Sequence, residues 1–262
     1  MDLEAQNLRQ IEQLNQRGGR ALSIVDLIRA GTIDVETAAY AMRALAEGAS
    51  LLTGARPGGA GKSTLLGALL GLLPPGVPLV TVDRSEVIRD GLKRPADEPA
   101  CYLAHEVGSG HWYGYIWGRD VPDFLRLIDG RRRSASCLHA DTLEELTGIL
   151  QEPPLRVRPD ALGRVGLILF IHVVAGGRRR VVSLWEADGA AGHRQVLAWD
   201  QDSDKFQSVG RLRDPAGLGP YERFLRGLVE GEPEMAMVRR RVVEFHRGGI
   251  GTQRAFLRSD RR

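Results

Sequence analysis

The chain has 262 residues, 43% hydrophobic and 26% charged, and this ordinary globular balance excludes disorder, collagen and coiled coil as its main state. Two cysteines, Cys101 and Cys137, are too few for a disulfide framework or a zinc site, which favours a reducing compartment. We expect no membrane span, because the apolar runs are shorter than about 20 residues, and no signal peptide at the N-terminus. The net charge of +3 is compatible with an anionic ligand and does not by itself indicate nucleic acid.

Helical signals dominate the first fifty residues. Apolar side chains recur at helical spacing over residues 3–14, and a capping pair, Ser23 and Asp26, precedes a second short helix. Asp34 is placed to cap a third helix. We therefore expect a helical lead-in over residues 1–49.

From residue 51 onward the pattern alternates between apolar strands and helices, which is typical of a parallel, doubly wound α/β sheet. Asp141 and Glu144 form a predicted capping box for one of the helices, and residues 91–110 show no regular pattern. The predicted strands are 51–53, 79–82, 113–117 and 134–138, and the predicted helices are 63–73, 122–128 and 141–150.

The pattern becomes that of antiparallel strands after residue 154. Strands are predicted over 165–174, 180–187 and 195–199, and the first two are joined by a turn at Gly176–Gly177. A helical tail rich in arginine follows from Pro220. The chain is thus divided into the lead-in 1–49, a core 50–215 and a basic helical tail 216–262.

A glycine-rich run between a predicted strand and a predicted helix carries the clearest chemical signal. Successive backbone amides in such a bend can surround a phosphate group, and the positive end of the helix dipole adds to the attraction. Lys62 is placed to reach the β- and γ-phosphates, and the Ser63 hydroxyl to hold Mg²⁺. A chance glycine turn is the alternative, which the strand–turn–helix context disfavours. The predicted nucleotide-binding residues are Gly58, Gly59, Ala60, Gly61, Lys62, Ser63 and Thr64.

One position departs from the common pattern G-x-x-x-x-G-K-S. Arg56 stands where the first glycine is expected, and Gly54 lies two residues too early. Two interpretations stay open: the loop is two residues longer at its entry, or Arg56 replaces the glycine.

The sequence around this run resembles the P-loop ATPases of type II and type IV secretion and pilus assembly, over about residues 21–200. The resemblance rests on the order and spacing of four segments. These are the lead-in with the P-loop, the acidic segment VTVDRSEV, the segment CLHADTLEEL, which is similar to the histidine box of that family, and the late hairpin VGLILFIHVVAGGRRRVVSLWEA.

The resemblance implies a RecA-like P-loop fold that uses ATP and Mg²⁺. Asp83 and Glu86 then match the acidic segment near Mg²⁺ and the attacking water, and His139 matches the histidine that senses the γ-phosphate. The structural alternatives are a cap or turn residue for Asp83, an exposed loop carboxylate for Glu86 and a strand-end histidine bonded to a carbonyl for His139.

The match is poorest at the strand that should precede the water-polarising glutamate. The family has Gly-Glu-x-Arg after an apolar strand, whereas here the strand YGYIW is followed by Gly118-Arg119-Asp120. Asp120 is the nearest carboxylate, with capping of the next helix as its alternative role, and Glu106 is a more distant candidate.

The resemblance implies a motor subunit that hydrolyses ATP to power pilus assembly or secretion. Such a subunit works in a ring, such as a hexamer, at the cytoplasmic face of the inner membrane, on a platform protein in that membrane. A hydrolysis-deficient regulatory or scaffold subunit is the alternative, because the expected glutamate is missing. Nucleic-acid binding is suggested only by the basic tail, and we do not expect it. The arginine runs 131–133 and 178–180 are candidate arginine fingers acting on a neighbouring subunit, with solvated turns as the alternative.

Overall fold

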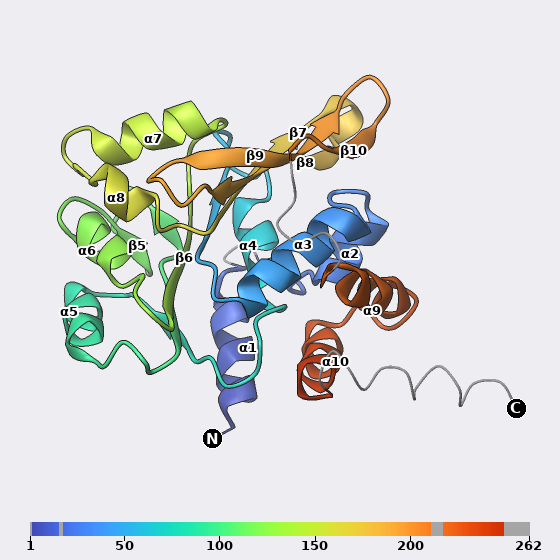
Figure 1. Cartoon of the computed structure of the whole chain (residues 1–262), viewed down its shortest axis with the longest axis horizontal. Helices are drawn as coiled ribbons and strands as arrows, with labels where there is room; N and C mark the ends of the chain where they lie inside the picture. Colours follow the sequence, from blue (N-terminus) through green and yellow to red (C-terminus); the bar gives the residue numbers. More distant parts are fainter. Residues whose placement is uncertain (1, 16–17, 211–216, 249–262) are drawn as a thin grey trace, which may run out of the picture.

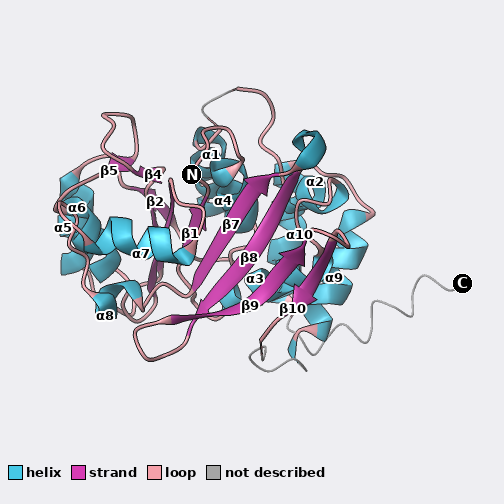
Figure 2. Cartoon of the chain, turned by 90° about the horizontal axis from the view of Figure 1, so that it is seen from above, coloured by secondary structure: helices cyan, strands magenta, loops and turns pink. Residues whose placement is uncertain are grey.

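The computed structural model describes residues 2–15, 18–210 and 217–248. A mixed, mostly parallel sheet runs through the centre of this part of the molecule, with helices on both faces (Figures 1 and 2). Its strands follow the order β10-β9-β8-β7-β1-β6-β3-β2, and the short strands β4 and β5 lie off this path. The strands are β1 (Leu51–Gly54), β2 (Leu79–Thr81), β3 (Ala100–Leu103), β4 (Glu106–Val107), β5 (Tyr115–Ile116), β6 (Arg132–Leu138), β7 (Leu167–Val173), β8 (Arg179–Ala187), β9 (His193–Asp200) and β10 (Lys205–Ser208).

The parallel half of the sheet confirms the predicted α/β class. Strand β1 pairs in parallel with β6 on one side and with β7 on the other, and β3 and β2 extend the sheet beyond β6. In a parallel sheet the carboxyl ends of the strands meet at one edge, so the loops after β1, β3 and β6 lie near one another.

The late strands β7, β8, β9 and β10 pair in antiparallel fashion, as expected, and Figure 2 shows them side by side. Strand β10 was not predicted. A short 3-10 turn, Ala175–Gly177, joins β7 to β8, and Gly176 and Gly177 adopt positive φ angles of 75° and 73° there. Positive φ angles are accessible to glycine at little cost, so this pair allows the tight turn between the two strands.

The helices form two layers, each with its own apolar core against one face of the sheet. One layer consists of α5 (Ser85–Lys93), α6 (Asp120–Arg126), α7 (Leu143–Gln151) and α8 (Pro159–Leu162). The other consists of α1 (Leu3–Gln13), α2 (Ile24–Arg29), α3 (Val35–Ala46), α4 (Lys62–Leu70), α9 (Gly219–Val229) and α10 (Met235–Arg247). Side chains of successive strand residues point to opposite faces of the sheet. Leu51 packs in the core with α4, and Leu52 packs in the core with α7.

Strand β3 was not predicted. It lies inside the stretch 91–110, where no element was predicted, and is buried between β6 and β2. The predicted strand 113–117 is reduced to the two residues of β5, which pairs only with β4 among the described strands. A run of four buried residues shows no alternation of polar and apolar side chains, so periodicity could not identify β3.

Two capping assignments also need correction. The side chain of Thr142, and not that of Asp141, caps α7 by accepting a hydrogen bond from the Glu145 amide at 3.2 Å. The Glu145 carboxylate in turn accepts from the Asp141 amide at 2.9 Å, so the box lies one residue later than expected. Asp120 is the first residue of α6, and its carboxylate accepts a hydrogen bond from Ser85 Oγ at 2.7 Å, so it does not cap that helix.

The lead-in and the tail pack on the same face of the sheet as α4. Helix α3 lies against α9, and buried side chains of α1, α2, α3, α9 and α10 share one apolar cluster with the helix that follows the glycine-rich loop. Residues 249–262 of the predicted tail lie outside the described residues. None of the described helices combines the length and the hydropathy needed to cross a membrane.

Gly54, the last residue of β1, allows a close approach that an alanine would prevent. A Cβ atom there would lie 2.6 Å from the Phe170 ring and 2.7 Å from the Ala140 carbonyl oxygen. We expect Gly54→Ala to lower the free energy of unfolding by about 2 kcal/mol, measured by urea denaturation, because the backbone would have to move. Gly148→Ala is the matched control: that position in α7 is open, and alanine should stabilise the helix by about 0.5–1 kcal/mol. Equal stability of the two variants would contradict the expectation.

Candidate functional site

The loop between β1 and α4 has the geometry of an anion cradle. Gly59 and Gly61 have φ angles of 84° and 107°, which residues other than glycine rarely adopt. Gly61 is the N-cap of α4 and has a left-handed backbone conformation. Lys62, which is 6% exposed, begins the helix, and its carbonyl accepts a hydrogen bond from Thr53 Oγ1 at 3.2 Å. The first amides of a helix lack partners within it, so those of α4 are available to a bound anion.

The cradle forms one wall of a cavity of about 690 Å³. This volume lies within the range of small-molecule sites, roughly 300–1,000 Å³. A second wall is lined by Glu106 of β4, Tyr115 of β5 and His139 after β6, and the tip of the β7–β8 hairpin lines a third. Residues 14–15 and 22–32 contribute a further wall, in which the apolar Leu14, Leu22, Leu27 and Ala30 lie among the polar Asn15, Asp26 and Thr32. A ligand with a polyanionic end and a flat apolar end would match these two kinds of wall.

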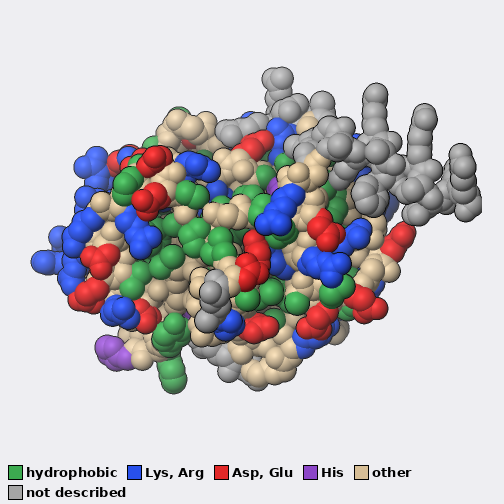
Figure 3. Space-filling view, turned by 90° about the horizontal axis from the view of Figure 1, so that it is seen from below, with side chains coloured by type: hydrophobic (Ala, Val, Ile, Leu, Met, Phe, Trp, Pro, Cys, Tyr) green, Lys and Arg blue, Asp and Glu red, His purple; other side chains and the backbone are tan. Residues whose placement is uncertain are grey.

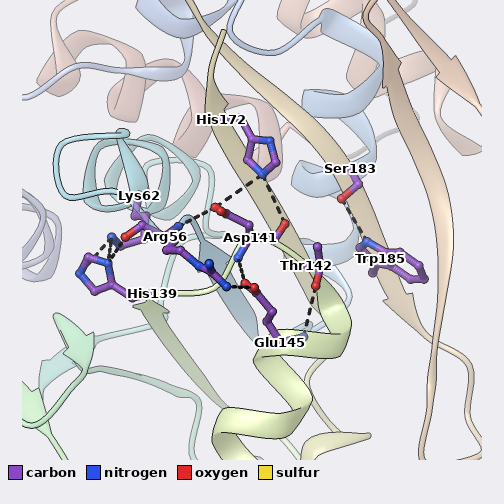
Figure 4. A network of polar contacts seen from close by, with 9 residues as sticks. All are labelled: Arg56, Lys62, His139, Asp141, Thr142, Glu145, His172, Ser183 and Trp185. Carbon is purple, nitrogen blue, oxygen red and sulfur yellow. Dashed lines mark hydrogen bonds and ion pairs between the residues drawn. The ribbon is translucent and has the colours of Figure 1, made fainter.

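Lys62 and His139 point toward each other across the cradle, from α4 and from the loop after β6 (Figure 4). Lys62 Nζ lies 3.3 Å from both ring nitrogens, and His139 Nδ1 lies 2.5 Å from the Arg56 carbonyl oxygen. On its other side His139 Nε2 lies 3.3 Å from Glu106 Oε1. Each ring nitrogen can donate or accept, depending on the tautomer, so His139 lies between Lys62 and Glu106 and can be a partner of both.

Two carboxylates line the cavity, Asp26, which pairs with Arg20, and Glu106, which lies beside His139. The Glu106 side chain is 12% exposed and lines the cavity together with Lys62, Ser63 and His139. Burial and the neighbouring Glu106 carboxylate raise the pKa of Tyr115 to about 12, so that hydroxyl stays protonated and donates a hydrogen bond to Glu106. Glu106 is therefore held in place from two sides, by Tyr115 and by His139.

The position of Glu106 follows from strand β3, which the sequence analysis missed. The apolar strand that precedes a cavity carboxylate is Ala100–Leu103, and not the stretch YGYIW. The sequence signal that could have identified it is the short apolar run from Ala100 to Ala104, with an acidic residue two positions later. Glu106 was treated only as a distant candidate.

Ser63 lines the same cavity, with its hydroxyl near the start of α4. Its Oγ is 3.8 Å from Cys137 Sγ, and burial raises the pKa of Cys137 to about 12, so that side chain stays a neutral thiol. Within the described ranges no group of three or more His, Cys, Asp or Glu side chains could hold a metal. The single hydroxyl of Ser63 fits Mg²⁺, because that ion binds through one or two protein oxygens together with nucleotide phosphates and water.

The other predicted catalytic carboxylates do not line this cavity. Asp83 follows the edge strand β2 and pairs with Arg84 at 3.1 Å, and Glu86 pairs with Arg89 on the surface of α5. Asp120 is bonded to Ser85, as described above. The structure brings together Lys62, Ser63, His139 and Glu106, and it does not bring Asp83, Glu86 and Asp120 to them.

Arg56 occupies the position of the first glycine without a positive φ angle, and Gly54 belongs to β1. These two facts favour a loop of ordinary length with arginine in place of glycine. The Arg56 amide donates to Asp141 Oδ1 at 2.6 Å, and its guanidinium pairs with Glu145 of α7 (Figure 4). The side chain thus leaves the cavity and ties the entry of the loop to the segment that carries His139.

Most of the predicted arginine fingers have other partners. Arg132 and Arg133 are buried and donate to the carbonyls of Gly91 and Leu45, at 2.8 and 2.5 Å. Buried arginines bonded to their own chain cannot reach a neighbouring subunit. On the β7–β8 hairpin, Arg178 and Arg179 line the cavity, whereas Arg180 is buried.

Comparisons with known proteins yield only distant similarity. No family model and no curated protein sequence matches the chain. Among solved structures, it is similar to the VirB11 ATPase from the Brucella suis type IV secretion system in complex with sulphate, at 17% identity and a TM-score of 0.42, over 58% of this chain and 52% of that chain. It is also similar to the Legionella pneumophila ATPase DotB, at 15% identity and a TM-score of 0.36, over 78% of this chain and 54% of that chain. This chain spans about half the length of the solved chains it matches, so we derive its function from the site itself.

Proposed function

We propose that this chain binds a nucleoside triphosphate with Mg²⁺ in the cavity at the glycine-rich loop and hydrolyses it. The observation that carries the proposal is the Glu106 carboxylate on the wall of the cavity that also contains Lys62 and Ser63. A phosphate cradle alone supports binding, whereas a fixed carboxylate facing it can also orient a water molecule.

The roles of the residues follow from their positions. The loop amides and Lys62 neutralise the phosphate chain, and Ser63 contributes a ligand to Mg²⁺, which lowers the charge of the phosphates when it is bound. Glu106 accepts a hydrogen bond from the attacking water. The water oxygen forms a bond to the γ-phosphorus while its proton passes to the Glu106 carboxylate and from there to solvent. The bond from that phosphorus to the β–γ bridging oxygen breaks, and the products are the nucleoside diphosphate and inorganic phosphate. The apolar side chains of Leu14, Leu22 and Leu27 accommodate the base.

Lys62→Ala tests this proposal most directly. We expect it to weaken binding of ATP with Mg²⁺ by roughly 100-fold in calorimetric titration, since a charge-assisted contact to the phosphates is lost. Lys205→Ala, an exposed lysine on β10 outside the cavity, is the control and should bind as the unchanged chain does. If the unchanged chain releases no heat with ATP or GTP, or if Lys62→Ala binds equally well, the proposal is wrong.

The cellular role proposed here rests on the motif resemblance. We propose a motor subunit of a pilus-assembly or secretion machine, acting in a ring on a platform protein at the inner face of the membrane. The hydrolysis-deficient scaffold remains the competing proposal, but the absence of a suitable carboxylate no longer supports it, because Glu106 faces the cradle. Steady-state phosphate release by the purified chain distinguishes the two.

Nucleic-acid binding has little support from the described part of the tail. Arg239 is buried, and Arg240 and Arg241 lie beside Glu244 on α10. On the face in Figure 3, basic and acidic side chains are interspersed over most of the surface. A continuous basic surface is what a phosphate backbone requires.

A further inference from the structure

The β7–β8 hairpin places one arginine at the phosphate cradle. Arg179 Nη2 donates a hydrogen bond to the Gly59 carbonyl oxygen at 3.1 Å. A Cβ atom on Gly61 would lie 3.3 Å from Arg179 Cδ, so the side chain lies directly against the loop. This is a contact within one chain, in contrast to the expectation that these arginines act on a neighbouring subunit.

The neighbouring arginines leave the segment on the side opposite Arg179, since successive side chains of an extended segment alternate, although Arg178 also borders the cavity. Arg178 pairs with Asp204 at 2.8 Å, and Arg180 pairs with the same carboxylate at 2.9 Å. Hydrogen bonds from Arg180, Trp199 and Arg178 hold the pKa of Asp204 well below its usual range. Asp204 thereby fixes both flanking residues and sets the direction of Arg179.

Arg179 carries its charge into the cavity without a carboxylate partner. Within the described residues it forms no ion pair, and a backbone carbonyl gives its guanidinium only partial compensation. It lines the same cavity as Lys62 and Ser63. The guanidinium is an exposed, forked donor that matches the oxygens of a phosphate group.

We propose that Arg179 contacts the terminal phosphate of the nucleotide bound to its own chain. Arg179 lies against Gly59 and Gly61 and lines the same cavity as Lys62, which reaches the β- and γ-phosphates, so its guanidinium starts beside that end of the ligand. When a triphosphate binds, the guanidinium exchanges the Gly59 carbonyl for a charged oxygen. The inference rests on the proposed nucleotide site and adds a residue that distinguishes triphosphate from diphosphate.

The test compares the affinities for ATP and ADP, both with Mg²⁺, in Arg179→Ala and in the unchanged chain. We expect Arg179→Ala to weaken ATP binding by roughly 10- to 100-fold and ADP binding by less than about threefold. The ATP affinity of Arg179→Lys should lie between those of Arg179→Ala and the unchanged chain. Arg126→Ala, an exposed arginine on α6 outside the cavity, is the control for loss of charge. An equal loss for ATP and ADP would show that Arg179 only braces the loop and would overturn the inference, as would unchanged ATP binding.

A mixing experiment tests whether the contact is made within one chain. Arg179→Ala is mixed with Lys62→Ala and titrated with a fluorescent ATP analogue. If Arg179 acts on its own chain, no site in the mixture has both residues and no tight site forms. Tight sites in the mixture would overturn the assignment, because a neighbour would then supply the arginine. Failure of the unchanged chain to bind ATP would instead refute the nucleotide site itself, so the two failures are distinguishable.

Discussion

Replacing Glu106 with glutamine is expected to lower the rate of ATP hydrolysis by about 10²- to 10⁴-fold. Glutamine keeps the size of the side chain but removes the carboxylate that accepts the hydrogen bond, and then the proton, of the attacking water. Lys62, Ser63 and the loop amides are unchanged, so the affinity for ATP should stay within about threefold of the original value. Single-turnover phosphate release measures the rate, and calorimetry measures the affinity.

Asp120→Asn tests the competing carboxylate. Asp120 lies on α6, bonded to Ser85 and outside the cavity, so we expect its replacement to have a smaller effect on turnover than Glu106→Gln. Asp123→Asn, an exposed carboxylate on the same helix that pairs with Arg126, is the matched control. If Asp120→Asn abolishes hydrolysis and Glu106→Gln does not, the assignment of Glu106 is wrong.

The largest expected effect on stability concerns Arg239 of α10, which is 2% exposed. Its guanidinium pairs with Glu4 of α1 at 2.7 Å and donates to the carbonyls of Gly71 and Leu73 at the end of α4. Arg239→Met keeps the apolar stem but leaves the buried carbonyls and the Glu4 carboxylate without this donor. We expect the free energy of unfolding to fall by about 3–5 kcal/mol, measured by urea denaturation.

Arg240→Ala is the matched control for this prediction. Arg240 is 70% exposed and pairs with Glu244 one turn away, so its loss should change the free energy of unfolding by less than about 0.5 kcal/mol. Equal effects of Arg239→Met and Arg240→Ala would contradict the view that Arg239 joins the last helix to the first. A large effect would establish that the lead-in and the tail stabilise the helix that carries the phosphate cradle.

Several features of the chain could be predicted because their causes are local. Ser23 and Asp26 form the expected capping box, and Asp34 accepts a hydrogen bond from the Thr37 amide at 2.8 Å. The glycines of the cradle were identified by their spacing before Lys62, and two of them have the positive φ angles that this bend requires. In each case the partners lie within a few residues of one another, so the sequence pattern contains the whole interaction.

The sequence alone determined the alternation of strands and helices, the cradle at Lys62 and the late antiparallel hairpin. Only the tertiary structure determined that β3 lies beside β6, which places Glu106 opposite a loop more than forty residues earlier in the chain. It likewise determined that Arg179 reaches Gly59, 120 positions away, while Asp83 remains at the edge strand. Strand order depends on how the whole chain buries its apolar surface, and no short segment contains that information.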